Sequence, residues 1–209
     1  MMNPYEIYLV ATKGTKNESV FLDIIESALQ GGVDLVQLRE KDLSANAFYH
    51  LALKVQEITK YYQKPLLIND RLDIALAIDA DGVHLGQEDL PIAKAREILG
   101  EDKILGLSVH NLAELALVRQ VDYIGVGAIF PTQSKADAQI VDIATLHQIT
   151  LHSPVPVVAI GGINQHNIKQ LSGIKLNGIA VVSAIMESQH PKESTEALKI
   201  AVQEITATD

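Results

Sequence analysis

Short apolar runs alternate with stretches of helical periodicity along the whole chain. Apolar runs of four or five residues are typical of strands that are buried on both faces, and apolar residues spaced three and four apart are typical of amphipathic helices. We therefore expect strands at residues 7–10, 35–38, 65–68, 82–85, 104–108, 123–127, 157–160 and 179–182. Helical patterns occupy residues 20–29, 48–58, 71–78, 112–118, 143–152, 165–171 and 193–205, with a further helix starting at Pro91.

This regular alternation indicates βαβ units with parallel strands, and so a protein of the α/β class. Eight strands can close into a barrel without exposed edges, so we expect a single (β/α)8 TIM barrel over residues 1–209. The alternative is an open doubly wound sheet. That fold usually carries a G-x-G-x-x-G turn after an early strand, and this chain has none. No linker or shift in composition marks a domain boundary.

Composition narrows the function classes. Hydrophobic residues make up 47% of the 209 residues and aromatic residues only 4%, which fits an aliphatic core. The formal net charge of -9 argues against a nucleic-acid partner. The absence of cysteine excludes disulfides and thiolate chemistry. No signal peptide and no apolar run long enough to cross a membrane are recognisable, so we expect a soluble cytoplasmic protein.

Polar residues gather after the expected strands. In (β/α)8 barrels the catalytic residues lie in the loops that follow the strands. In this chain those loops carry arginine, lysine, aspartate, asparagine, serine and histidine, whereas opposite connections such as residues 99–103 and 152–156 carry nothing comparable. The asymmetry predicts an active site at the C-terminal end of the barrel.

Two of these loops have the character of a phosphate site. Gly161 and Gly162 follow the seventh expected strand, and Ser183 follows the eighth. Barrels commonly bind phosphate at these positions, where glycine lets backbone N–H groups approach and a helix N-terminus favours the anion. The alternative interpretation is a tight turn followed by a helix cap.

Cations and carboxylates follow the earlier strands. Arg39 and Lys41 alternate along the chain and should point the same way, and Lys135 adds a charge from another loop. Asp70 and Asp89 follow neighbouring strands and could share a Mg²⁺ ion that also binds phosphate oxygens. The alternatives are a solvated surface cluster for the cations and helix caps for the two aspartates. No cluster has the spacing of a zinc site.

Ser108 and His110 stand two residues apart at the end of the fifth expected strand. A serine–histidine nucleophile pair is conceivable, but the chain lacks the G-x-S-x-G motif and an obvious third member. His110 or Asn111 could instead cap the following helix. His84, on the fourth expected strand, suits a hydrogen-bonded interior position as well as a ligand contact.

Taken together, these segments resemble the thiamine-phosphate synthase family from about residue 8 to residue 185. The resemblance rests on seven segments in order, each after its own strand: QLREK (37–41), ND (69–70), HLGQED (84–89), SVH (108–110), PTQSK (131–135), GGI (161–163) and VSA (182–184). It implies a (β/α)8 barrel that joins hydroxymethylpyrimidine diphosphate to thiazole phosphate with release of pyrophosphate. The reaction in this family is understood as dissociative, with the diphosphate leaving first.

The resemblance also implies roles for individual residues. The diphosphate should be held by Arg39, Lys41, Asn69 and Lys135, and Mg²⁺ by Asp70 and Asp89. The pyrimidine should lie against Gln37 and Ser108. The thiazole phosphate should be received by Thr132, Ser134, Gly162, Val182 and Ser183. Catalytic contributions are expected from Ser108, as a contact to the substrate, and from Lys135, Arg39 and Lys41, which would stabilise the leaving group electrostatically.

Two other functions stay open. A TenI-like thiazole tautomerase resembles the synthase and would use His110 as acid and base, and a non-catalytic barrel could have kept only the phosphate pocket. The presence of Lys41, Asp70, Asp89 and Lys135 favours the synthase. The segment of residues 11–13 and the plain stretch of residues 136–139 depart from the family pattern. The oligomeric state is open, a homo-oligomer included.

Overall fold

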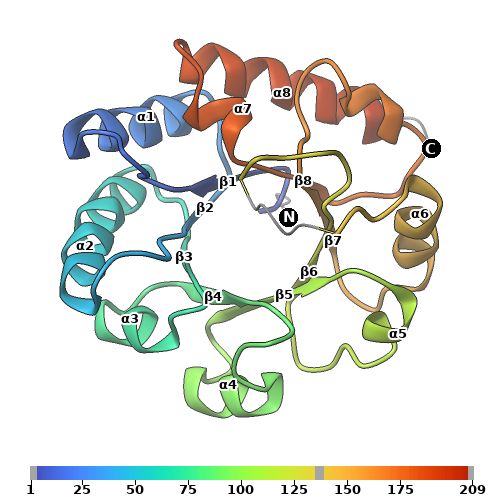
Figure 1. The fold of residues 1–209 in the computed structure, drawn as a ribbon, viewed down its shortest axis with the longest axis horizontal. Helices are drawn as coiled ribbons and strands as arrows, with labels where there is room; N and C mark the ends of the chain where they lie inside the picture. Colours follow the sequence, from blue (N-terminus) through green and yellow to red (C-terminus); the bar gives the residue numbers. More distant parts are fainter. Residues whose placement is uncertain (1–3, 135–138, 207–209) are drawn as a thin grey trace.

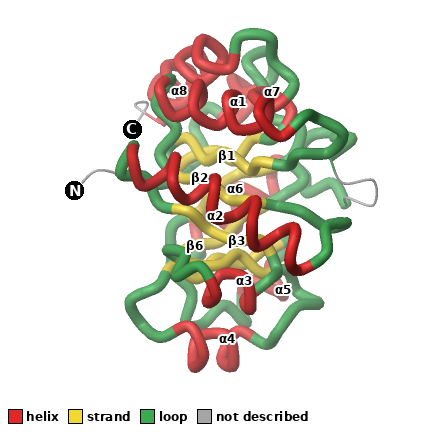
Figure 2. Tube along the Cα trace, turned by 90° about the vertical axis from the view of Figure 1, so that its left-hand side faces the viewer, coloured by secondary structure: helices red, strands yellow, loops and turns green. Residues whose placement is uncertain are grey.

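The expected barrel is present. The structure is a computed structural model of the chain that describes residues 4–134 and 139–206. Eight parallel strands form a closed barrel in chain order, and β1 pairs with β8 to complete the ring. Figure 1 looks into this ring and shows the helices arranged around its outside, and Figure 2 shows the same layers from the side.

The strands are short, and most are followed by a helix. The strands are β1 (Ile7–Ala11), β2 (Leu35–Leu38), β3 (Leu66–Asn69), β4 (Gly82–Leu85), β5 (Ile104–Val109), β6 (Tyr123–Val126), β7 (Val157–Ile160) and β8 (Gly178–Val181). The helices are α1 (Glu18–Gln30), α2 (Ala45–Tyr61), α3 (Leu72–Ala77), α4 (Ile92–Leu99), α5 (Leu112–Leu115), α6 (Ile143–His152), the 3₁₀ helix η1 (Ile168–Leu171), α7 (Ser183–Met186) and α8 (Pro191–Thr206).

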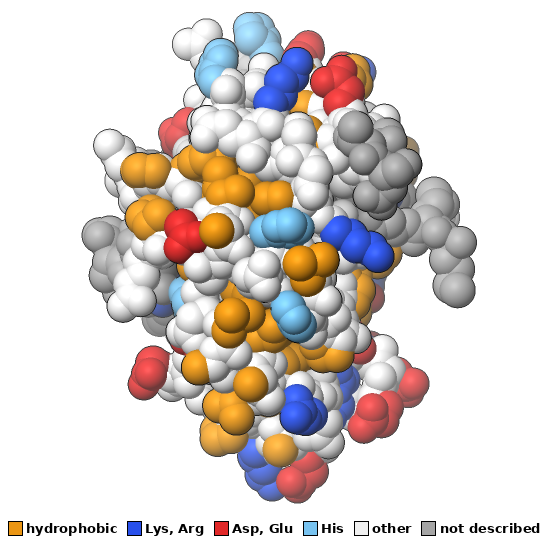
Figure 3. Space-filling view, turned by 90° about the vertical axis from the view of Figure 1, so that its right-hand side faces the viewer, with side chains coloured by type: hydrophobic (Ala, Val, Ile, Leu, Met, Phe, Trp, Pro, Cys, Tyr) orange, Lys and Arg blue, Asp and Glu red, His pale blue; other side chains and the backbone are white. Residues whose placement is uncertain are grey.

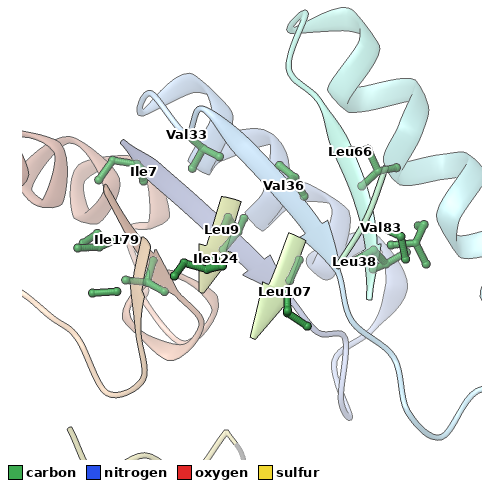
Figure 4. Close-up of a cluster of buried hydrophobic side chains, with 14 of the residues drawn as sticks. Ile7, Leu9, Val33, Val36, Leu38, Leu66, Val83, Leu107, Ile124 and Ile179 are labelled. Atoms are coloured by element: carbon green, nitrogen blue, oxygen red, sulfur yellow. The ribbon is translucent and has the colours of Figure 1, made fainter. Parts of the chain in front are cut away.

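The two faces of each strand have different neighbours because successive side chains point to opposite sides. Outward-facing residues pack under the helices in the larger apolar cluster. Figure 4 shows members of this cluster from several strands, including Ile7, Leu9, Val36 and Ile124. The burial of this layer is what holds the helices on the barrel, since apolar burial is the main favourable term in folding.

The inside of the barrel holds a smaller apolar cluster. It is formed mainly by Tyr5, Tyr8, Val10, Leu35, Leu67, Tyr123, Val158 and Ala180. On β2 to β5 the inward-facing positions nearest the C-terminal ends are polar, namely Gln37, Asn69, His84 and Ser108. The interior is therefore apolar near the strand beginnings and polar near the strand ends, which prepares the C-terminal mouth of the barrel for polar ligands.

Several boundaries differ from the sequence prediction. The third strand starts at Leu66 because Pro65 has no N–H to donate to the sheet. The segment 165–171 is helical only at Ile168–Leu171, in a 3₁₀ helix. Side chains compete with the backbone there: Asn167 Nδ2 donates to the carbonyl of Gly162 at 2.8 Å, and the N–H of Asn164 donates to Asn167 Oδ1 at 2.9 Å. The short α7 was not predicted as a separate element.

Away from the mouth, the outer layer has a shallow hollow of about 390 Å³. It is lined by Leu112, Leu115, Ala116, Arg119, His152 and Pro154, on and beside α5 and α6. Figure 3 shows that apolar and histidine side chains are mixed over this side of the molecule. No helix within residues 4–134 and 139–206 is long and apolar enough to span a membrane.

Candidate active site at the strand ends

Asp70 stands at the point where the chain leaves β3. Its backbone is left-handed, with φ of 60°, a conformation that aspartate tolerates better than most residues. Its N–H donates to the carbonyl of His84 on β4 at 2.9 Å, so this turn is fastened to the neighbouring strand. Asn69, the last residue of β3, is buried beside it. Asp70 therefore lies between the end of β3 and the start of α3, at the C-terminal end of the barrel.

Asp89 lies in the loop after β4. Its Oδ2 accepts a hydrogen bond from the N–H of Gly86 at 2.6 Å, which closes a tight turn. The caps of α3 and α4 are Arg71 and Pro91, and neither helix start has a side-chain cap hydrogen bond. The alternative that Asp70 and Asp89 serve as helix caps is therefore wrong.

The two carboxylates lie next to each other. The pKa of Asp70 is raised, chiefly by burial, and then by the charge of Asp89 and a hydrogen bond to it. The nearby charges of Lys41 and Arg39 act in the opposite direction. Lys41 Nζ lies 3.6 Å from Asp70 Oδ2. The structure thus brings together two carboxylates and two cations that the sequence placed in three separate segments.

This pair of carboxylates fits a divalent cation. Among residues 4–134 and 139–206, no group of three or more histidine, aspartate or glutamate side chains is arranged to hold a metal ion. Mg²⁺ is commonly bound by only one or two carboxylates together with water and substrate phosphates. A cation between Asp70 and Asp89 would also relieve the repulsion that raises the pKa of Asp70.

Arg39 and Glu40 join the mouth to the loop after β1. The N–H of Arg39 donates to the carbonyl of Ala11 at 2.9 Å, which continues the β1–β2 pairing past the strands. Glu40 Oε1 accepts a hydrogen bond from the N–H of Lys13, and burial raises the pKa of Glu40. The Arg39 guanidinium has no hydrogen bond or ion pair to the described residues, so its donors can serve a ligand.

Gln37 and Ser108 face the barrel interior from β2 and β5. Gln37 Nε2 donates to the hydroxyl of Tyr8, and Gln37 is almost completely buried. Ser108 Oγ lies 3.0 Å from His84 Nε2. His84 is therefore a hydrogen-bonded interior residue, one of the two alternatives that the sequence left open. The loop after β4 is also tied to this point, because Gln87 Nε2 donates to the carbonyl of Ser108 at 2.6 Å.

His110 makes no pair with Ser108. Its Nδ1 lies 2.9 Å from Glu114 Oε2, which also accepts from the N–H of His110. Asn111 caps α5 by accepting from the N–H of Glu114 at 2.9 Å. The hydroxyl partner of Ser108 is His84 on the neighbouring strand, so the conceivable Ser108–His110 nucleophile pair is absent.

The loops after β6 and β7 support each other. Gly161 and Gly162 both have positive φ, at 100° and 64°. A Cβ on Gly161 would come within 2.4 Å of the Ala128 Cβ, and one on Gly162 within 2.5 Å of the Pro131 carbonyl. Only glycine fits at these two positions. The turn at Gly162 therefore packs directly against the backbone of the segment that leads to Thr132. The N–H of Ser134 donates to Thr132 Oγ1 at 3.2 Å.

The loop after β8 turns directly into a short helix. Val182 precedes α7, which begins at Ser183 and has no side-chain cap. The N–H groups at this helix start are not engaged by a capping side chain, as a phosphate site requires. Lys135, the third expected cation, lies outside the described residues.

Tyr8 and Tyr123 were not among the predicted site residues. Both are fully buried inside the barrel, and their hydroxyl groups lie 2.8 Å apart. Tyr123 also contacts His84 Nδ1 at 2.7 Å. The available signal was a tyrosine in an otherwise aliphatic strand, because a buried hydroxyl group needs a hydrogen-bond partner.

Comparison with known proteins adds independent findings. A family model described as thiamine monophosphate synthase matches residues 7–185. A thiamine-phosphate synthase from Campylobacter jejuni subsp. jejuni serotype O:2 is 50% identical over 198 residues, covering 95% of this chain and 94% of that protein. One from Methanobrevibacter smithii is 53% identical over 194 residues, covering 92% of each. The solved thiamine phosphate pyrophosphorylase from Pyrococcus furiosus superposes with a TM-score of 0.88 at 36% identity, covering 97% of this chain and 98% of that one.

Proposed function

The chain belongs to the thiamine monophosphate synthase family, and we propose that it condenses hydroxymethylpyrimidine diphosphate with thiazole phosphate to give thiamine phosphate and pyrophosphate. The observation that carries this proposal is the cluster of Lys41, Asp70 and Asp89 at the ends of β2, β3 and β4. A barrel that bound only one monophosphate would have no use for this second charged region on the side of the mouth opposite the β7 and β8 loops.

The cluster suits a diphosphate. Lys41 and Arg39 offer donors and positive charge, and the buried amide of Asn69 adds a neutral contact at the end of β3. We assign Asp70 and Asp89 to Mg²⁺, which when bound would neutralise phosphate charge. Lys135 is assigned to the same diphosphate from the sequence pattern. These groups give an acidic protein a local positive field where its anionic substrate binds.

The chemistry that follows needs no protein nucleophile. The bond between the pyrimidine methylene carbon and the diphosphate oxygen breaks, and the leaving diphosphate takes the electron pair. The thiazole nitrogen then forms a bond to that methylene carbon. Arg39, Lys41 and Lys135 stabilise the charge that develops on the leaving group, which is electrostatic catalysis by preorganised groups. Ser108 and Gln37 hold the pyrimidine ring.

The second substrate is assigned to the other side of the mouth. Gly162 follows β7 and Val182 and Ser183 follow β8, so their backbone N–H groups can meet the thiazole phosphate. Thr132 and Ser134 add hydroxyl groups from the loop after β6, which packs against the Gly162 turn. The reacting carbon and nitrogen would then meet between the two phosphate-binding ends.

The purified protein with both phosphorylated precursors and Mg²⁺ provides the test. We expect thiamine phosphate and pyrophosphate in equal amounts, with neither formed when one precursor is omitted. Formation of neither product, with conversion of a thiazole carboxylate phosphate tautomer instead, would establish the TenI-like reaction and overturn the proposal. Tight binding of a phosphorylated precursor with no reaction of any kind would indicate a non-catalytic barrel.

A further inference from the structure

Five polar side chains form one continuous hydrogen-bonded chain through the inside of the barrel. Tyr8 and Tyr123 hydroxyl groups are 2.8 Å apart, Tyr123 lies 2.7 Å from His84 Nδ1, and His84 Nε2 lies 3.0 Å from Ser108 Oγ. Gln37 Nε2 donates to Tyr8 at the other end. The chain thus links Gln37 on β2 with Ser108 on β5 through three buried side chains that lie below the mouth.

The neighbouring strands leave room for this chain. A Cβ on Gly106 would lie 2.3 Å from the ring of Tyr123, and a Cβ on Gly125 would lie 3.3 Å from His84 Cε1. Tyr5 supports the centre, since its ring centroid lies 4.9 Å from that of Tyr123. Glycine at two inward-facing strand positions and an aromatic support below fix the Tyr123 and His84 rings, so their hydrogen bonds have a defined geometry.

The hydrogen bonds between Gln37 and Ser108 all run in one donor-to-acceptor direction. Gln37 donates to Tyr8, so an arrangement that uses every hydroxyl proton has Tyr8 donating to Tyr123 and Tyr123 donating to His84 Nδ1. An imidazole that accepts at Nδ1 carries its proton on Nε2 and donates from there. His84 therefore donates to Ser108 Oγ, and the hydroxyl proton of Ser108 is left to point away from the histidine, towards the mouth.

The neutral state of the ring agrees with this direction. Burial is the main cause that lowers the pKa of His84, to about 4, and the charge of Asp89 opposes it only in part. A doubly protonated ring would donate to Tyr123 as well, and Tyr8 would then receive two donors and have no acceptor for its own proton.

We propose that Tyr8, Tyr123 and His84 are positioning residues that hold Ser108 as a hydrogen-bond donor and Gln37 with its carbonyl Oε1 exposed to the substrate. Tyr8 accepts one of the two N–H groups of the Gln37 amide and so fixes which way the amide faces, and no described residue donates to Oε1. This inference rests on the proposed synthase function for the identity of the substrate. The relay, by which we mean the series of hydrogen bonds from Gln37 to Ser108, is a property of the free protein.

The direction of the relay sets a specificity rule. A ring that offers a hydrogen-bond acceptor to Ser108 and a donor to Gln37 matches both residues, and an aminopyrimidine offers its ring nitrogens and its amino group. A hydroxypyrimidine in its keto form presents a carbonyl where the amino group stood, which faces the Gln37 carbonyl without a proton between them. Such a mismatch between buried polar groups discriminates strongly.

The first test is the tautomer of His84 in the free protein. Nitrogen NMR of protein labelled at histidine separates protonated from unprotonated ring nitrogens, and His84→Gln identifies the signal of this one histidine among 7. We expect a neutral ring with its proton on Nε2. A proton on Nδ1, or a charged ring at neutral pH, would overturn the direction of the relay. This measurement needs no turnover, so it stands apart from the test of the synthase function.

The second test removes one hydroxyl group at a time. Tyr123→Phe should abolish the single tautomer of His84 and raise KM for the pyrimidine diphosphate about tenfold, the scale of one lost hydrogen bond, with KM for the thiazole phosphate unchanged. Tyr8→Phe should raise the same KM but keep the tautomer, because Tyr123 still donates to His84.

Tyr62→Phe is the matched control. The Tyr62 hydroxyl is hydrogen-bonded to Glu26 and Gln30 on the outside of the barrel, so its loss should change neither readout. If Tyr123→Phe behaves like Tyr62→Phe in both the NMR signal and the pyrimidine KM, the relay is wrong. Equal rises in KM for both substrates would also overturn it, because a relay that acts through Gln37 and Ser108 changes the binding of the pyrimidine alone.

Discussion

The two ends of the barrel treat charged side chains in opposite ways. Where the strands begin, Asp34 and Asp122 each have several partners: Asp34 accepts from Lys64 and Lys199, and Asp122 accepts from Arg96 Nη2 and from the backbone of β5. Where the strands end, Asp70 lies beside the like charge of Asp89, and Lys41 Nζ stands 3.6 Å from Asp70 Oδ2.

The difference teaches which charges serve the fold and which serve a ligand. Arg96 is buried and gives hydrogen bonds to three carbonyls as well as to Asp122, so it fastens α4 to the chain before β5 and β6. Asp70 gains no comparable partner within the described residues and is held in a state that disfavours its charge. Charges that are left uncompensated in the free protein are typical of functional sites.

The largest expected effect is on turnover at the mouth. Lys41→Ala should lower kcat/KM by about 10²-fold, the scale of one lost electrostatic contact in the transition state, with an unchanged melting temperature. The control is Lys103→Ala at the other end, where the side chain pairs with exposed Asp79. Its steady-state rate should equal that of the wild type. Equal activity of the two variants would contradict the division of the barrel into two ends.

The next effect is on stability at the end where the strands begin. Arg96→Leu should lower the free energy of unfolding by about 3 kcal/mol, because three carbonyls and Asp122 lose their donor. Urea unfolding measures this loss, and kcat measured well below the melting temperature should stay at the wild-type value. A stable but inactive Arg96→Leu protein would show that this end also serves catalysis.

Low pH should lower the stability of the barrel interior around His84. The pKa of His84 falls from 6.5 in the unfolded chain to about 4 in the fold, so the unfolded chain binds one more proton between these values. The contribution of His84 is therefore present above pH 6.5 and is lost as the pH falls, by about 3 kcal/mol once the pH is below the folded pKa. Urea unfolding at several pH values should give a shallower acid loss for His84→Gln. Identical slopes would mean that folding does not lower the pKa of His84.

A smaller effect of opposite sign is expected for Asp70. The raised pKa means that its favourable contribution is present below the unfolded pKa and is lost as the pH rises through the folded pKa. At neutral pH and without metal, Asp70→Asn removes the repulsion from Asp89, and asparagine accepts the left-handed backbone at this position. Its melting temperature should rise by up to a few degrees. A fall in melting temperature would show that the Asp70 charge stabilises the free protein.

The fold could be predicted from the sequence because its signals are local and repeated. Eight apolar runs with helical patterns between them leave few topologies, and the family resemblance selected the same one. The predicted helix lengths were wrong where other hydrogen bonds compete locally with the helical ones. The helix expected at 165–171 is short because Asn164 and Asn167 bind the Gly162 turn, and α5 ends at Leu115 as its next turn tightens into i to i+3 bonds at Leu117 and Val118.

The site could be predicted from the sequence only where a residue type is itself typical of a binding or catalytic role. Lys41, Asp70 and Asp89 stood out as charged residues after strands, and the fold brings them together. Tyr8 and Tyr123 did not, because a tyrosine in an apolar strand looks like core packing until its partner is known. Their hydrogen bond joins residues 115 positions apart in the chain, a pairing that depends on barrel closure and that no local pattern contains.

The most direct measurement is the rate of thiamine phosphate formation by Asp70→Asn relative to the wild type, with both precursors and Mg²⁺ at a temperature where both proteins are folded. The proposed function predicts steady product formation by the wild type and a loss of about 10²-fold or more in the variant. Undiminished synthesis by a folded Asp70→Asn protein would contradict the assignment of this end of the barrel to the diphosphate. Absence of synthesis in the wild type would contradict the function itself.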